Sequence, residues 1–145
     1  MLVKKRTGHA VRREPLNTRA TTVEDLEVFK LAHDLVLRIY QVTRAFPREE
    51  TFGLVAQLRR SAASIPANLA EGGARLNRAE YRQFVGIAKG SAAEVSYHLL
   101  LAGDLGYLQL EECRGLRDDY VRVGQMLTRL AQALSLHMTG WFGRW

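Results

Sequence analysis

Apolar residues recur three and four positions apart in four long stretches, and this spacing constrains the fold more than any other feature. The four lines run over Val28–Phe46, Leu54–Leu69, Val85–Ala102 and Cys113–His137. Such spacing places the residues of each line on one face of an α-helix. No stretch shows the alternation of apolar and polar residues that marks a half-buried strand. Because short connections between long helices favour antiparallel neighbours, the pattern predicts an all-α, antiparallel, up-down-up-down four-helix bundle.

Helix boundaries are marked by prolines, glycines and capping residues. The residue before a proline avoids the α region, glycine commonly follows a helix, and Asn with Glu three positions later resembles a capping box. The first helix is expected to have acidic residues in its first turn, where the helix dipole favours them. The residues that carry these signals are Glu24, Asp25 and Glu27, then Pro47, Gly72-Gly73, Asn77 with Glu80, and Gly103–Gly106.

A proline lies inside the second line of apolar residues. Pro66 lacks a backbone donor, and its ring clashes with the carbonyl one turn earlier. We therefore expect a kink or a break in the second helix between Ala62 and Pro66.

Positive charge is concentrated in two segments of a chain whose net charge is +6. Residues 1–20 hold six basic residues against one acidic residue, and residues 51–90 hold six against two. The absence of periodicity predicts a disordered basic arm over 1–20, followed by the bundle over 21–138. Residues 139–145 form an aromatic C-terminal tail with Trp141, Phe142 and Trp145. Such uneven charge favours a polyanionic partner, although a basic arm can also be merely solvated.

Basic residues of the middle segment share one side of the third helix. Arg78, Arg82 and Lys89 fall within about 40° of one another around the helix axis. Arginine presents a planar fork that suits phosphate oxygens, so this side is a candidate for backbone contacts with nucleic acid. The alternative is a solvated face with internal ion pairs, such as Arg60 with Glu71 or Glu94. The full set of candidate nucleic-acid-binding residues is Arg59, Arg60, Arg75, Arg78, Arg82, Lys89, and in the arm Lys4, Lys5, Arg6, Arg12 and Arg13.

Small residues follow a face of the second and third helices that a monomeric bundle would leave in water. The third helix carries Ala79, Gly86, Gly90 and Ala93, and the second carries four alanines at similar spacing. A glycine in a helix interior costs roughly 0.5–1 kcal/mol relative to alanine, so a close backbone approach is expected to compensate. We therefore predict that the protein self-associates through these faces, the alternative being a tightly packed monomer.

No residue pattern typical of catalysis stands out. The single Cys113 excludes an intramolecular disulfide and a cysteine-based zinc site. Glu94 and His98 stand at i and i+4 only once, whereas a di-iron bundle needs two Glu-x-x-His motifs and two further carboxylates. The sequence thus predicts a protein that is not an enzyme and that has no metal or cofactor. No apolar run of about 18 residues could span a membrane and no signal peptide is evident, so we expect a cytoplasmic protein without a membrane partner.

The middle of the chain resembles a known family. Residues 57–72, with the sequence QLRRSAASIPANLAEG, resemble the signature of the four-helix bundle proteins encoded in intervening sequences of 23S ribosomal RNA genes, also called the S23 ribosomal protein family. Residues 24–28, 87–94 and 105–108 also fit, so the resemblance covers roughly residues 23–135. The arm, the aromatic tail and the residues that follow Gly72 depart from the family pattern.

The resemblance implies an antiparallel four-helix bundle that assembles as a ring-like homopentamer without catalytic activity. It also implies a nucleic-acid partner, RNA more than DNA. The family is similar in fold to the accessory protein of diversity-generating retroelements, which partners a reverse transcriptase. The resemblance therefore implies a second function, that of a scaffold or adaptor for such a protein partner.

The positions that match the family signature are expected to be mainly structural. Polar members of the second and third helices would form a hydrogen-bonded seam between these helices or between subunits, because buried polar groups need partners. The expected seam residues, which include two glycines of the small-residue face, are Gln57, Ser64, Pro66, Asn68, Glu71, Gly86, Gly90, Ser91 and Glu94.

Overall fold

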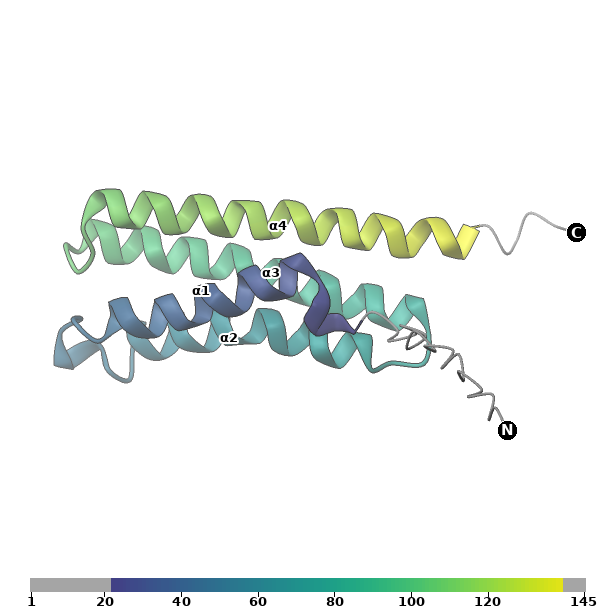
Figure 1. Cartoon of the computed structure of the whole chain (residues 1–145). Coiled ribbons are helices and arrows are strands. Elements are labelled where there is room, and N and C mark those ends of the chain that lie inside the picture. Colours follow the sequence, from purple (N-terminus) through teal and green to yellow (C-terminus); the bar gives the residue numbers. More distant parts are fainter. Residues whose placement is uncertain (1–21, 140–145) are drawn as a thin grey trace, which may run out of the picture.

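The protein is an all-α bundle of four long helices packed antiparallel in chain order, as predicted (Figure 1). The structure, a computed structural model, describes residues 22–139, with side chains through Ser135. Two short 3-10 helices, η1 and η2, precede α1 and α2. The elements are η1 Val23–Asp25, α1 Glu27–Thr43, η2 Arg48–Glu50, α2 Leu54–Gly73, α3 Arg78–Asp104 and α4 Leu110–Thr139. Within the described part of the chain, no helix is long and apolar enough to cross a membrane.

The predicted lines of apolar residues form the core. Ile39, Leu58, Leu99 and Leu127, one from each long helix, are completely buried. The first helix differs in detail from the expectation, because it ends at Thr43 and Phe46 is buried in the loop that follows. Since the apolar side of every helix faces the same interior, burial of these residues is the main force that holds the bundle together.

Local signals set most of the helix ends. Asn77 caps α3 as predicted, since its Oδ1 accepts the backbone N–H of Glu80 at 2.9 Å. Gly106 takes a positive φ of 77° in the turn after α3. Of the three acidic residues expected in the first turn of the first helix, only Glu27 lies in α1. Glu24 and Asp25 lie in η1, where Asp25 Oδ2 accepts the backbone N–H of Thr22 at 3.0 Å.

Of the kink or break predicted at Pro66, the break is wrong. α2 continues through Pro66 from Leu54 to Gly73. An interior proline costs about 3 kcal/mol or more through its lost hydrogen bond and its clash with the preceding turn. Here Pro66 itself is buried, and both Ile65 and Leu69 are completely buried beside it. Burial of such side chains contributes about 1.5–3 kcal/mol each, so the packing of α2 outweighs the proline.

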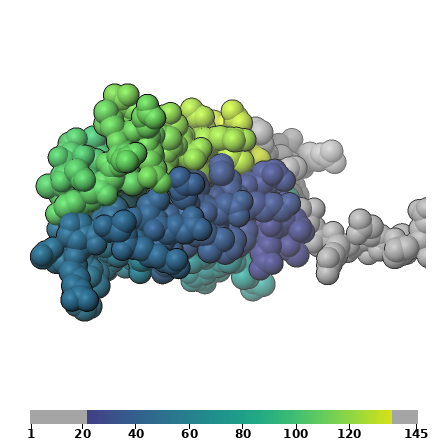
Figure 2. Space-filling view, turned by 60° about the vertical axis from the view of Figure 1, so that its left-hand side comes forward, coloured from purple at the N-terminus to yellow at the C-terminus, as the bar shows by residue number. Residues whose placement is uncertain are grey.

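Neighbouring helices pack more extensively on some sides of the bundle than on others. α3 packs extensively on both α2 and α4, whereas α1 has its main contact with α2 and only a slight one with α4. Figure 2 looks onto the side where α1, in blue, lies beside α4, in green and yellow. The slight contact leaves a groove between α1 and α4, while α2 and α3 form the opposite side of the bundle.

Candidate nucleic-acid interface

The basic residues expected on one side of α3 are exposed there. Arg78 and Arg82 lie in the first turns of the helix, and Lys89 follows two turns later. Ion pairs among the described side chains join Lys30 to Glu27, Arg38 to Glu112 and Arg75 to Glu71, and none involves these three cations. The three exposed side chains, which we call the α3 basic row, therefore extend over about 16 Å without a carboxylate partner in this part of the chain.

Arg75 lies just before α3 and is held by neighbours on both sides. Its Nη2 donates to Glu71 Oε1 at 3.0 Å, and its guanidinium lies 4.8 Å from the centre of the Phe84 ring. Phe84 belongs to α3 and Glu71 to α2, so Arg75 helps to fix the α2–α3 turn. It remains largely exposed despite these contacts.

Arg59 connects α2 to α1. Its Nε donates to Thr43 Oγ1 at 3.0 Å, and its guanidinium lies 4.5 Å from the centre of the Tyr40 ring. A second bond runs from Nη2 to the Tyr40 carbonyl at 3.4 Å. This arginine is thus used inside the bundle, in addition to any contact it makes with a ligand.

The expected pairing of Arg60 with Glu71 or Glu94 is wrong within this chain. Arg60 Nη2 instead donates to Gln57 Oε1 at 2.6 Å, one helical turn away. Glu71 pairs with Arg75, and Glu94 is exposed on α3 without an ion pair among the described residues.

The polar side chains of α2 bond to their own helix and do not form a seam with α3. Ser64 Oγ donates to the Ser61 carbonyl at 2.8 Å, and Asn68 Nδ2 donates to the Ser64 carbonyl at 2.7 Å. Ser61 Oγ does the same with the Gln57 carbonyl at 2.6 Å. Small polar side chains reach back one turn in this way, so they need no partner on another helix. Among the described residues these side chains therefore do not join α2 to α3, and a seam between subunits stays a prediction.

The close approach of α2 and α3 occurs at a glycine that sequence reasoning took only as a helix end. A Cβ on Gly72 would lie 2.7 Å from Phe84 Cβ and 2.8 Å from Tyr81 Cδ2, so no side chain fits there. Gly86 and Gly90, where a close approach was expected, behave differently. A Cβ at either position would meet nothing within 4 Å, so the bundle itself does not explain these glycines.

A hollow of about 380 Å³ lies between α3 and α4, next to Lys89. Arg117 of α4 lines it, and Arg117 Nε donates to Ser96 Oγ of α3 at 3.3 Å. Tyr97 lines the same hollow and is 58% exposed. Sequence reasoning missed both residues. Arg117 belongs to α4 and reaches the α3 basic row only through the packing of α4 on α3, whereas Tyr97 lies on α3 itself, two turns beyond Gly90.

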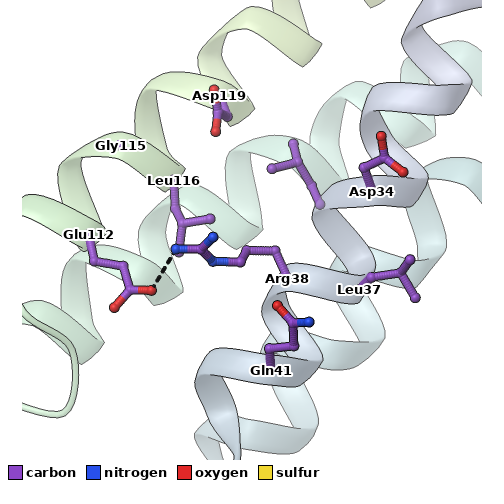
Figure 3. Close-up of a pocket in the computed structure, with 9 residues that line it drawn as sticks. Asp34, Leu37, Arg38, Gln41, Glu112, Gly115, Leu116 and Asp119 are labelled. Carbon is purple, nitrogen blue, oxygen red and sulfur yellow. Dashed lines mark hydrogen bonds and ion pairs between the residues drawn. The ribbon is translucent and has the colours of Figure 1, made fainter.

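A groove of about 540 Å³ lies on the other side of the bundle, between α1 and α4 (Figure 3). Arg38 spans it and donates to Glu112 Oε1 at 2.9 Å. Asp34 and Asp119 also line this groove, so its carboxylates outnumber its single guanidinium. Positive and negative side chains are thus separated on the surface. The α3 basic row lies on α3, and the acidic groove lies between α1 and α4.

No group of three His, Cys, Asp or Glu side chains between 22 and 135 could hold a metal ion. Cys113 is buried, and its thiol donates to the Leu99 carbonyl at 3.1 Å. Burial raises the pKa of the Tyr120 phenol, and the nearby charge of Asp119 raises it further. The Tyr120 hydroxyl has no hydrogen-bond partner in the described bundle.

Several predicted residues lie outside the described part of the chain. They are Lys4, Lys5, Arg6, Arg12 and Arg13 of the basic arm, and the aromatic residues of the tail from Trp141 to Trp145.

Comparison with known proteins supports the resemblance noted in the sequence. The chain is similar to a crystallised protein of unknown function from the S23 ribosomal protein family of Bacteroides thetaiotaomicron. The two are 25% identical, with a TM-score of 0.67 over 72% of this chain and 97% of the other. No curated protein matches significantly. The sequence profile of the 23S rRNA-intervening sequence proteins matches residues 24–129, which is most of the chain. The chain therefore belongs to the 23S rRNA-intervening sequence protein family.

Proposed function

We propose that this protein is a non-enzymatic, oligomeric helical bundle that binds the phosphate backbone of nucleic acid, RNA in preference to DNA. The observation that carries the proposal is the α3 basic row, whose three cations are exposed and make no ion pair with the described side chains. Unpaired cations in a row suit a polyanion, because each can contact a phosphate and release a counterion. The preference for RNA rests on the family resemblance.

Self-association is the second part of the proposal. Gly86 and Gly90 are exposed, and a Cβ at either would enter open space. Ala79 and Ala93 continue this small-residue strip on the outward side of α3. A helix of a second copy can approach such a strip closely, which would compensate for two mid-helix glycines. In a ring-like homopentamer the α3 basic row would repeat around the ring, and the basic arm would add further contacts.

The experiment is a binding titration by fluorescence anisotropy, with labelled RNA and DNA at several salt concentrations. The test variant is Arg78→Gln/Arg82→Gln/Lys89→Gln. For single strands the logarithm of affinity changes with the logarithm of salt by about −0.7 per phosphate contact, so removing three contacts should flatten that slope by about 2. A charge-matched control replaces exposed arginines of other elements, Arg48→Gln/Arg122→Gln/Arg129→Gln.

The control separates a specific surface from general positive charge. We expect the control to bind much more tightly than the test variant. Equal losses in both variants would contradict the assignment to α3, and no binding by the unmodified protein at low salt would remove the proposed function.

A scaffold for a protein partner, such as a reverse transcriptase, is the second candidate. Phe52 in the α1–α2 turn is 96% exposed, and Leu76 in the α2–α3 turn is fully exposed. Burial of either side chain against a protein partner would remove apolar surface from water and stabilise the complex. Co-purification of a partner that is lost in Phe52→Ser and retained after nuclease treatment would favour this function.

A further inference from the structure

The α3 basic row continues into the hollow between α3 and α4. Lys89 is the last residue of the row and also lines the hollow. Ser96 lies two turns further along α3, on the same side of the helix, and holds Arg117 through the 3.3 Å bond from Nε. Cations therefore follow one another from Arg78 to Arg117 over about 27 Å. α3 and α4 run antiparallel and pack extensively on each other (Figure 1).

The lining of the hollow combines positive charge with an aromatic surface. Tyr97 is 58% exposed, although a tyrosine of this size is usually better covered. Leu100 and Val121 provide apolar surface beside it, and no carboxylate lines the hollow. The α1–α4 groove, of similar size, is lined by three carboxylates. The two sites differ in charge, and only the hollow suits a ligand with an aromatic ring between negative groups.

We propose that this hollow is a nucleobase subsite. It takes one unstacked base of a single strand against Tyr97, while Lys89 and Arg117 hold the phosphates on either side of that base. Stacking on aromatic rings between cations is how proteins bind single strands without reading their sequence. The subsite deepens the proposed function and rests on it. Its consequence is a preference for single strands, because a base inside a duplex is stacked and paired and cannot reach Tyr97.

The small-residue strip adjoins this subsite. Ala93, the last small residue of the strip, also lines the hollow, and Tyr97 lies one turn beyond it. The strip and the subsite therefore meet at Ala93, so assembly size is followed together with binding in the test.

The test compares a single strand with a duplex in binding titrations of the full-length protein. The probes are a labelled oligouridine of about 10 nucleotides, long enough to cover the cations from Arg78 to Arg117, and an RNA duplex of equal length. We expect Tyr97→Ala to weaken binding of the oligouridine by roughly 5- to 150-fold, and binding of the duplex by less than about 2-fold. Tyr97→Phe keeps the ring and should bind like the unmodified protein. Ile87→Ala is the matched control, since Ile87 is equally exposed on another side of α3.

The outcomes separate this proposal from the more general one. Equal losses of both probes in Tyr97→Ala, or no loss of either, would overturn the subsite and leave backbone binding intact. A change in assembly size in Tyr97→Ala, followed by light scattering, would instead assign Tyr97 to an interface between copies and overturn the subsite as well. If the unmodified protein binds neither probe, the proposed function itself fails.

Discussion

Replacing both exposed glycines of α3 by alanine gives opposite results for a monomer and for an assembly. In the isolated chain a Cβ at Gly86 or Gly90 meets nothing within 4 Å, so each substitution should act only through helix propensity. A glycine in a helix interior costs about 0.5–1 kcal/mol relative to alanine. The double variant should therefore stabilise a lone bundle by about 1–2 kcal/mol. For a domain of this size that raises the melting temperature by roughly 4–8 °C.

The proposed assembly predicts a different result. If a helix of a second copy lies against the strip, two added methyl groups separate the packed backbones, and overpacking typically costs 1–3 kcal/mol. We expect Gly86→Ala/Gly90→Ala to dissociate at concentrations where the unmodified protein is assembled. We also expect the dissociated variant to have a higher free energy of unfolding than the dissociated unmodified chain. Sedimentation velocity measures the assembly, and thermal unfolding at several concentrations measures the stability, which depends on concentration for an oligomer.

Two other glycines provide controls for this experiment. A Cβ on Gly115 of α4 also meets nothing within 4 Å, so Gly115→Ala should stabilise the chain by about 0.5–1 kcal/mol without changing its assembly. Gly72→Ala should destabilise the fold at every concentration, because its Cβ would lie 2.7 Å from Phe84 Cβ. An unmodified protein that is monomeric throughout, with a double variant that is merely more stable, would refute the reasoning about self-association.

Three further substitutions test the bundle itself. Arg59→Ala should lower the free energy of unfolding by about 1–2 kcal/mol in urea titrations, since it removes the contact with the Tyr40 ring and the bond to Thr43, and Arg59→Lys should restore only part of it. Asn77→Ala should cost about 0.5–2 kcal/mol through loss of the α3 cap, and unchanged stability would contradict the capping role. Tyr120→Phe should leave stability unchanged or raise it by about 1 kcal/mol, because the buried hydroxyl has no partner in the described bundle. The raised pKa of Tyr120 means that the folded chain keeps a proton that the unfolded chain releases above about pH 10, so stability should fall with rising pH there, and less steeply in Tyr120→Phe.

Local patterns in the sequence predicted the elements well. Spacing of apolar residues identified the four long helices and nearly all of the core, and Asn77 marked the start of α3. These features depend on residues within one or two helical turns of each other, so the amino-acid order alone expresses them. The same is true of the side shared by Arg78, Arg82 and Lys89, because a helix of known extent fixes their relative angles.

Features that depend on packing between helices were predicted poorly. Pro66 was expected to kink or break α2, but the helix is not broken, because the residues beside it are buried. The polar side chains of α2 were expected to have partners on α3 or on another subunit, and within the chain they bond to carbonyls one turn back. The first outcome depended on packing against residues far away along the chain, and the second on a choice between local and distant partners that the sequence did not reveal.

By itself, then, the order of residues determined that this chain forms four amphipathic helices and that three basic residues share one side of the third, since both properties follow from the 3.6-residue period of a single helix. Only the tertiary structure decided that Gly72 is the point of close contact, that Arg59 is held by α1, and that Arg117 and Tyr97 flank a hollow at the end of the α3 basic row. Those contacts depend on the rotation and offset of one helix against another, which are set by how all the side chains pack together.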